Sequence, residues 1–255
     1  MHNEIWPGGH RAALSLVIHV PAVADASATN AATTLVGIDY AATGLQRLLD
    51  AVSDFDVSAT TAWTAAAIAT SPQLVRAAAD QGHDVAISIT HESAGDLVDV
   101  RATAQRLAGV DVTGVAELYA TSSIVNDLPA DLITWTISRQ SGDFPSLGVL
   151  TSDAPTTVSL PTSPYWIDAV WLNPAVPAPP SAFLETLSTA LQSMRTVEGL
   201  MTVVIHPHIS GRPGFVETIT RFLDEAIASG DVWIAKASDI AAWWRTQHGA
   251  PGKAE

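Results

Sequence analysis

The sequence has no cysteine, little charge and few basic residues, and each absence excludes a class of function. Without cysteine, the 255-residue chain has no disulfide, no thiolate nucleophile and no thiolate metal ligand. Acidic residues number 26 against 12 Lys and Arg, which gives a formal net charge of −14. Nucleic-acid backbones and anionic membrane surfaces repel such a chain. We therefore expect no nucleic-acid partner, and any metal would need histidine and carboxylate ligands.

Long apolar runs and linkers are also missing. No apolar run approaches the roughly 20 residues of a membrane span. Residues 1–11 lack the basic region and apolar core of a secretory signal, so we expect a cytoplasmic protein without a membrane partner. Hydrophobic residues make up 47% of the chain and charged residues 15%, and no Pro/Gly/Ser-rich linker divides it. This composition predicts one compact domain over residues 1–255.

Hydrophobic patterning predicts strands that alternate with helices. Residues 11–20 have the continuous apolar character of a buried strand, and residues 38–54 have the periodicity of an amphipathic helix. The same reasoning predicts strands at 57–63 and 84–89, and helices at 73–81, 95–107 and 181–195. Strands that alternate with helices in one domain form either a doubly wound sheet or a barrel, and the pattern does not separate the two.

The region after residue 200 carries the most informative pattern. An apolar run ends in His206-Pro-His208-Ile-Ser-Gly-Arg212-Pro, and a helical segment, a Val-Trp strand and a second helix follow up to residue 245. Barrel enzymes keep their chemistry at the carboxyl ends of strands, and imidazole exchanges protons near neutral pH. The pattern predicts a site at these histidines. The alternative is a buried strand followed by a polar loop with solvated histidines.

This region resembles the end of the polysaccharide deacetylase superfamily, also called the NodB-homology or carbohydrate esterase family 4-like superfamily. The resemblance is strongest to the branch of allantoinase-like and cyclic-imide hydrolases, and it covers nearly the whole chain in order. It implies an α/β fold, a single-domain irregular (β/α)7 barrel. The Ala/Thr-rich composition of residues 22–36, between the first strand and the first helix, predicts a long loop over the barrel mouth. The resemblance also implies a hydrolase lineage that acts on non-peptide C–N bonds in a small amide, imide or acetylated molecule.

The resemblance also identifies departures from the family's metal site. The family's first strand ends in Asp-x-Asp, which supplies the general base and a metal ligand, and the matching positions are His19 and Pro21. A proline ring offers no ligand atom. A second motif supplies two metal-binding histidines, and here Ile87 or Ser88 matches the first and His91 the second. The family's arginine, which orients the base, is missing from residues 113–119. The resemblance therefore implies a degenerate site without a metal cofactor.

Three histidines are the candidates for chemistry at the expected barrel mouth. His206 matches the family's general acid, His19 stands in the position of the base, and His91 would orient or polarise the substrate. The open alternative is a substitute site for zinc or another divalent metal built from the same three imidazoles. Such a site would also need partners that orient its ligands.

Further substrate-binding candidates follow from the resemblance. In the cyclic-imide branch a Leu-Pro strand leads into aromatic and acidic residues at the substrate mouth, and Trp166, Asp168 and Trp171 match that segment. Ordinary aromatic packing in a loop or a subunit interface is the alternative for the tryptophans. His208 is a polar candidate beside His206. Arg212 either binds a substrate carboxylate or locks its own turn through backbone carbonyls.

Several function hypotheses remain open at this point. The first is an enzyme of the deacetylase lineage that transforms a C–N bond without the usual metal. The second is a catalytically silent barrel, kept as a binding module or as the non-catalytic subunit of a hetero-oligomer with an intact homologue; a homo-oligomer is equally compatible. The third is an active metal-dependent deacetylase with a rebuilt histidine site. A serine hydrolase based on Ser88 and His91 is disfavoured because no Gly-x-Ser-x-Gly elbow surrounds the serine.

Overall fold

The structure is a computed structural model that describes residues 4–21, 40–89, 94–118, 132–139, 142–148, 157–171 and 178–248. Its strands are β1 (Ala12–Val20), β2 (Thr60–Trp63), β3 (Asp84–Ser88), β4 (Gly114–Glu117), β5 (Trp135–Arg139), β6 (Ser146–Gly148), β7 (Thr157–Thr162), β8 (Leu200–Ile205) and β9 (Val232–Ile234). Its helices are η1 (Pro7–Gly9), α2 (Tyr40–Ser53), α3 (Ala65–Thr70), α4 (Pro72–Asp80), α5 (Ala94–Ala108), η4 (Pro164–Trp166), α6 (Asp168–Trp171), α7 (Pro180–Val197), α8 (Val216–Ala228) and α9 (Ala237–His248).

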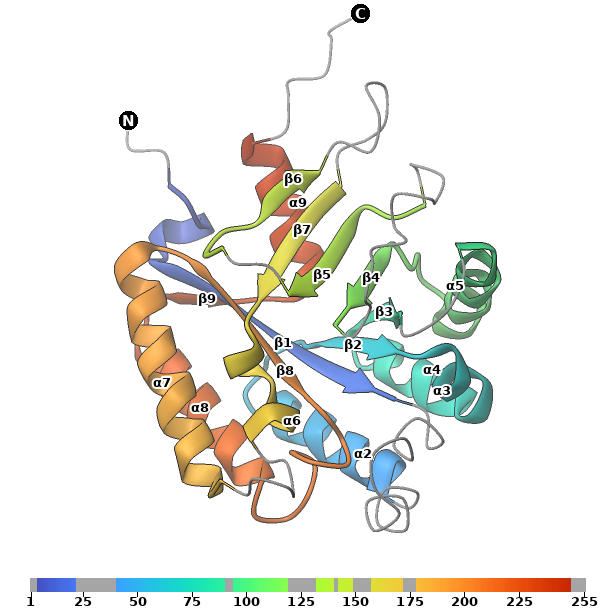
Figure 1. Ribbon diagram of the computed structural model, residues 1–255, viewed down its shortest axis with the longest axis horizontal. Helices are drawn as coiled ribbons and strands as arrows, with labels where there is room; N and C mark the ends of the chain where they lie inside the picture. The colour runs from blue at the N-terminus through green and yellow to red at the C-terminus, as the bar shows by residue number, and fades with distance from the viewer. Residues whose placement is uncertain are drawn as a thin grey trace, which may run out of the picture.

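The strands form one curled sheet with helices around it (Figure 1). The order is β6-β7-β5-β4-β3-β2-β1-β8, and β9 pairs with β1. Every pairing is parallel except that of β6 with β7. Seven parallel strands, β1, β2, β3, β4, β5, β7 and β8, follow one another around the curled sheet, as in the predicted (β/α)7 barrel, and β9 adds an eighth parallel strand beside β1.

The two ends of this sheet approach each other between β7 and β8. Ile167 forms an isolated parallel bridge with Val204 of β8. Just before it, Thr162 at the end of β7 donates its hydroxyl hydrogen to the backbone oxygen of Thr202, at 2.8 Å. These contacts bring residues that follow β7 next to residues that follow β8. The barrel is irregular because this closure rests on one bridge rather than on a full strand ladder.

The longest strand is β1, which lies between β2 and β8 and whose nine residues are all buried. Its alternating side chains enter two separate cores, as the period of two along a strand requires. Leu14, Leu16 and Ile18 belong to the outer core, which also contains residues of α2, α7 and α8. Ala13 and Val17 belong to the inner core inside the curled sheet. Both faces of the sheet are therefore covered, as expected for parallel strands.

The amino ends of the strands form a structure that we call the floor. Trp6, fully buried, packs on Trp233 and Trp244 with ring centroids 6.2 and 5.6 Å apart, and its indole nitrogen donates to the backbone oxygen of Glu198 at 2.7 Å. Beside this cluster the Asp84 carboxylate accepts hydrogen bonds from the backbone and side chain of Ser238, at 3.0 and 2.9 Å, and so caps α9. The floor connects the chain before β1 to the last helix.

Most predicted elements are confirmed with shifted boundaries, including the strand, helix, strand, helix order of the last region. The strand predicted over residues 57–63 begins only at Thr60, and the helices α3 and α6 were not predicted. Helices this short have too few turns to give a periodic signal. Residues 22–36, predicted as a loop over the mouth, lie outside the described residues. No helix in the described part of the chain is long and apolar enough to cross a membrane.

Candidate functional site

Three inward-facing positions bring polar side chains together at the carboxyl ends of the strands, a region that we call the mouth. His19 lies two residues after Val17 on β1, Ser88 two residues after Ala86 on β3, and His206 two residues after Val204 on β8. The period of two therefore continues each inner-core row into a polar side chain. All three are buried, with His19 and His206 only 2% and 3% exposed. The ring centroids of His19 and His206 are 4.9 Å apart.

His206 is held by a buried carboxylate. Its Nδ1 lies 2.5 Å from Oδ1 of Asp168, and its backbone N–H donates to Oδ2 of the same residue at 2.8 Å. The hydroxyl of Ser210 also donates to Oδ2, at 2.6 Å. Asp168 is fully buried. A carboxylate accepts hydrogen bonds, so in neutral His206 the ring proton resides on Nδ1 and Nε2 carries the accepting lone pair.

His19 belongs to a second buried pair. Its Nε2 lies 2.7 Å from the hydroxyl oxygen of Ser88, and either group donates according to the tautomer. The strand between them, β2, contributes small Ala62 in register with His19, so the imidazole crosses this strand to reach β3. Burial lowers the pKa of His19 well below its usual value, and the neighbouring His206 and His208 lower it further. His19 is therefore neutral at physiological pH.

His208 extends the histidine cluster toward the surface. Its ring centroid is 5.5 Å from that of His206. Burial lowers the pKa of His208 to about 4, with a further decrease from His206. Arg212 donates from Nε to the backbone oxygen of His208 at 2.7 Å, as in the predicted alternative of a turn locked through carbonyls. At neutral pH, His208 thus adds hydrogen-bonding capacity to the mouth rather than charge.

The loop after β8 is clamped against α2 by a close approach of two glycines. A Cβ atom on Gly44 of α2 would overlap the backbone oxygen of Pro207, and one on Gly211 would overlap the same oxygen and the oxygen of Gly44. Arg47, one turn after Gly44, donates to the backbone oxygen of Gly211. Only glycine allows this spacing. The clamp fixes the backbone that carries His206 and His208.

The other predicted site residues lie in different surroundings. Trp166, 8% exposed, packs in the outer core, and Trp171 donates from its indole nitrogen to the backbone oxygen of Tyr165 at 2.8 Å. Both support the segment that positions Asp168. His91 lies outside the described residues. The structure thus brings together His19, His206, His208 and Asp168 from the predicted set, and places Arg212 on the same loop. The roles of all these residues in ligand binding stay predictions.

Two residues of the cluster were not predicted as site residues, Ser88 and Ser210. In the sequence, Ser88 matches the position of a lost metal ligand and is disfavoured as a hydrolase nucleophile, and Ser210 lies between the candidates His208 and Arg212. The sequence pattern could have identified Ser88, because this residue lies on the same face of a predicted strand as Ala86, two residues earlier. No local signal identifies Ser210, since its partner Asp168 lies 42 residues earlier in the chain.

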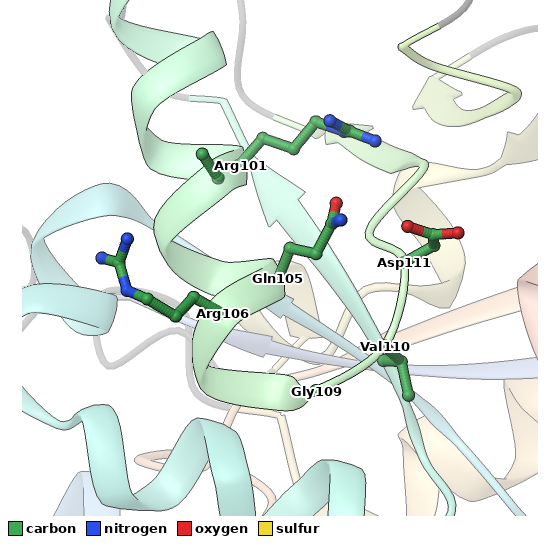
Figure 2. A pocket seen from close by; sticks show the side chains of 7 residues that line it. Arg101, Gln105, Arg106, Gly109, Val110 and Asp111 are labelled. Carbon is green, nitrogen blue, oxygen red and sulfur yellow. The ribbon is translucent and has the colours of Figure 1, made fainter.

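A cavity of about 570 Å³ lies elsewhere, at the carboxyl end of α5, and contains none of the predicted site residues. Figure 2 shows Arg101 and Gln105 projecting from α5 on the side of the loop that carries Asp111, whereas Arg106 points away. Arg101 donates from Nε to the backbone oxygen of Val112 at 2.6 Å, so it fastens this loop to the helix. The cavity adjoins the loop that leads into the amino end of β4, opposite the mouth.

Comparisons with solved structures identify the fold. A polysaccharide deacetylase structure from Mycobacterium smegmatis aligns with a TM-score of 0.83 at 24% identity, over 98% of this chain and 96% of that one. The PuuE allantoinase aligns with a TM-score of 0.83 at 18% identity, over 96% and 94%. The chain has the polysaccharide deacetylase fold. No family model and no curated protein matches the sequence.

A protein with a similar fold is described as inactive. The protein BA3943 from Bacillus anthracis, described as a carbohydrate esterase family 4 pseudoenzyme, aligns with a TM-score of 0.53 at 12% identity, over 90% of this chain and 65% of that one. A mutant of BA3943 is described as having restored enzymatic activity. Identities this low relate the folds alone, so the deacetylase fold is compatible with both active and inactive sites.

The donor atoms that the structure describes in the mouth do not make up a divalent metal site by themselves. A hydrolytic metal site needs about three protein ligands and an open position. Within the described residues, no group of three or more His, Asp or Glu side chains is arranged to hold an ion. Nε2 of His19 faces Ser88, and Nδ1 of His206 faces Asp168, an arrangement that would also orient a metal-binding imidazole. The remaining predicted donor, His91, is outside these residues.

Proposed function

We propose that this protein binds a small amide- or imide-like molecule at the mouth and hydrolyses its C–N bond with His206 as the proton-transfer group. The observation that carries the proposal is the buried hydrogen bond of 2.5 Å between Asp168 and Nδ1 of His206, supported by Ser210. A histidine that only packs in the core does not need a buried carboxylate that orients its ring. Such an arrangement is typical of a general acid or base.

The reaction follows from the tautomer that Asp168 favours. Nε2 of His206 accepts a proton from water as the water oxygen bonds to the carbonyl carbon of the ligand. The same nitrogen then donates this proton to the nitrogen of the breaking C–N bond, which gives a carboxylic acid and an amine or amide; in a cyclic imide both groups stay in one ring-opened molecule. Asp168 stabilises the imidazolium that exists between the two transfers. His206 thus serves as base and then as acid.

His19 and Ser88 have a different role in this proposal. A histidine with so low a pKa accepts a proton only weakly, so His19 is a poorer base than its position in the sequence suggests. The neutral pair of His19 and Ser88 instead offers hydrogen bonds that orient the ligand or its developing oxyanion. His208 contributes in the same way at the entrance, with His91, Trp166 and Trp171 as further candidates.

The test is turnover and binding measured with the purified protein. We expect loss of the imide absorbance of succinimide or hydantoin, or heat on titration with these compounds, and a decrease in kcat of about 100-fold or more in His206→Ala. His248→Ala is the matched control, because this histidine is exposed in the last turn of α9 and is not part of the mouth. Its ring stacks on Trp244, with the ring centroids 3.9 Å apart. Turnover that survives in His206→Ala would contradict the proposal.

A silent barrel is the second candidate, favoured by the absence of a metal-donor set in the described residues and by the pseudoenzyme with the related fold. In that case the protein would bind a ligand or an intact homologue without turnover, as a homo-oligomer or hetero-oligomer. Light scattering with and without a co-expressed homologue distinguishes these states. Calorimetric zinc titration tests the third candidate: tight zinc binding lost in His91→Ala would establish a rebuilt metal site.

A further inference from the structure

Ser210 is buried beside the carboxylate that holds His206. It is 1% exposed, and its hydroxyl donates to Oδ2 of Asp168 at 2.6 Å. We propose that Ser210 is a positioning residue that fixes the tautomer of His206 by holding the Asp168 carboxylate in one orientation. The proposal rests on the proposed function for its catalytic consequence, but the tautomer itself is measurable without turnover.

The geometry assigns a separate task to each carboxylate oxygen of Asp168. Oδ2 accepts two hydrogen bonds, from the backbone of His206 at 2.8 Å and from Ser210 at 2.6 Å. Oδ1 is thereby turned toward Nδ1 of His206, at 2.5 Å. A carboxylate held at one oxygen by two donors from different directions has a fixed plane. The other oxygen then has a fixed direction toward the imidazole.

The chain between His206 and Ser210 explains why one short turn supplies all three hydrogen bonds. The backbone N–H groups of Ile209 and Ser210 both donate to the backbone oxygen of His206, at 3.0 and 2.9 Å. This turn folds Ser210 back beside the backbone N–H of His206. Asp168 approaches the turn as the first residue of α6, directly after Ile167, which bridges to β8. The turn and the helix therefore meet at the carboxylate.

Removal of the Ser210 hydroxyl has a specific consequence. Oδ2 would keep one donor, and the torsion between Cβ and Cγ of an aspartate is broad and weakly restrained. The carboxylate would then rotate away from Nδ1 for part of the time. Because neutral imidazole carries its proton on either nitrogen, the tautomer with the proton on Nε2 would become populated. That tautomer cannot accept a proton at Nε2, so it is inactive as the proposed base.

The experiment is a long-range ¹H–¹⁵N spectrum of protein labelled with ¹⁵N-histidine, recorded at pH 7.5. His206→Gln assigns the signals of His206 by their loss. We expect the wild type to show the Nδ1–H pattern and Ser210→Ala to show a mixture of the two tautomers. Ser210→Thr, which keeps the hydroxyl, restores the wild-type pattern. Ser193→Ala is the matched control, because Ser193 is an exposed serine of α7.

A His206 spectrum that is the same in Ser210→Ala as in the wild type would overturn the proposal. This readout is independent of catalysis, so a protein that turns over no amide or imide would refute the proposed function and leave the positioning role standing. Where turnover is found, we expect kcat of Ser210→Ala to fall about 10-fold with KM little changed, and Ser210→Thr to recover it. Should Ser210→Ala fail to fold, Ser210→Cys replaces the hydroxyl with a slightly larger and weaker donor and gives the same readout.

Discussion

The floor and the mouth are opposite ends of the same parallel strands, and their polar groups have different partners. In the floor, Trp6 donates to a backbone oxygen and Asp84 caps the backbone of α9, so side chains fasten chain segments to one another. In the mouth, His206, Asp168 and Ser210 bond mainly through their side chains, and His19 bonds to a hydroxyl. The floor thus uses its polar side chains to join chain segments, whereas the mouth also has side chains that orient imidazoles, beside the backbone contacts of Arg47 and Arg212.

Removing the largest buried side chain of the floor should have the largest effect on stability. Trp6→Ala deletes a fully buried indole, its packing on Trp233 and Trp244, and its hydrogen bond to Glu198. We expect the free energy of unfolding to fall by about 3–5 kcal/mol, measured by urea denaturation. The ligand affinity of the remaining folded protein should be unchanged. A variant that unfolds normally but loses ligand binding would contradict the division between floor and mouth.

Lowering the pH should reduce the free energy of unfolding by a smaller amount, through the histidines of the mouth. An unfolded histidine has a pKa near 6.5, and folded His208 has a pKa of about 4, so between these values the unfolded state binds more protons. Stability is therefore complete above pH 6.5 and falls as the pH falls toward 4, by about 3 kcal/mol at most from this group. The lowered pKa of His19 acts in the same direction.

The check is urea denaturation of the wild type, His208→Gln and the surface control His248→Gln at pH 7 and pH 4.5. We expect the stability that the wild type loses on acidification to exceed the loss in His208→Gln, while His248→Gln follows the wild type. The same acid-induced loss in all three proteins would show that His208 does not contribute to the acid response of the mouth.

Loss of the helix cap in the floor should have the smallest effect. Asp84→Ala removes the acceptor for the backbone N–H and hydroxyl of Ser238 at the start of α9. We expect a loss of about 1–2 kcal/mol in the free energy of unfolding, because the carboxylate acts as an acceptor at the start of α9 and also contacts the Thr60 hydroxyl and Lys236. Asp80→Ala, which removes an exposed carboxylate at the end of α4, is the control and should be near neutral. Equal losses in the two variants would refute the capping role.

Much of the fold could be predicted from the sequence because its signal is local. The apolar run of β8 and the periodic stripe of α2 each report their own secondary structure, and their order in the chain is typical of a β/α barrel. The short helices α3 and α6 escaped prediction for the opposite reason. They contain too few turns to show a period, and only their contacts with the rest of the barrel define them.

The candidate site could be predicted only in part. The position of His206 at a strand end followed from the apolar run before it, and its resemblance to a family motif indicated a role. Its partner Asp168 lies 38 residues away, and the partner of His19 lies 69 residues away. Such pairs are decided by the curvature and register of the sheet, which a single sequence does not display.

The sequence by itself determined the alternation of strands and helices, and thereby the end of the sheet at which the histidines lie. Alternation of side chains along a strand is a property of the backbone. The order of residues in each strand therefore determines that His19, Ser88 and His206 end inward-facing rows. Only the tertiary structure decided which groups these residues bond. Hydrogen bonds form between atoms a few ångströms apart, and the curling of the sheet sets those distances.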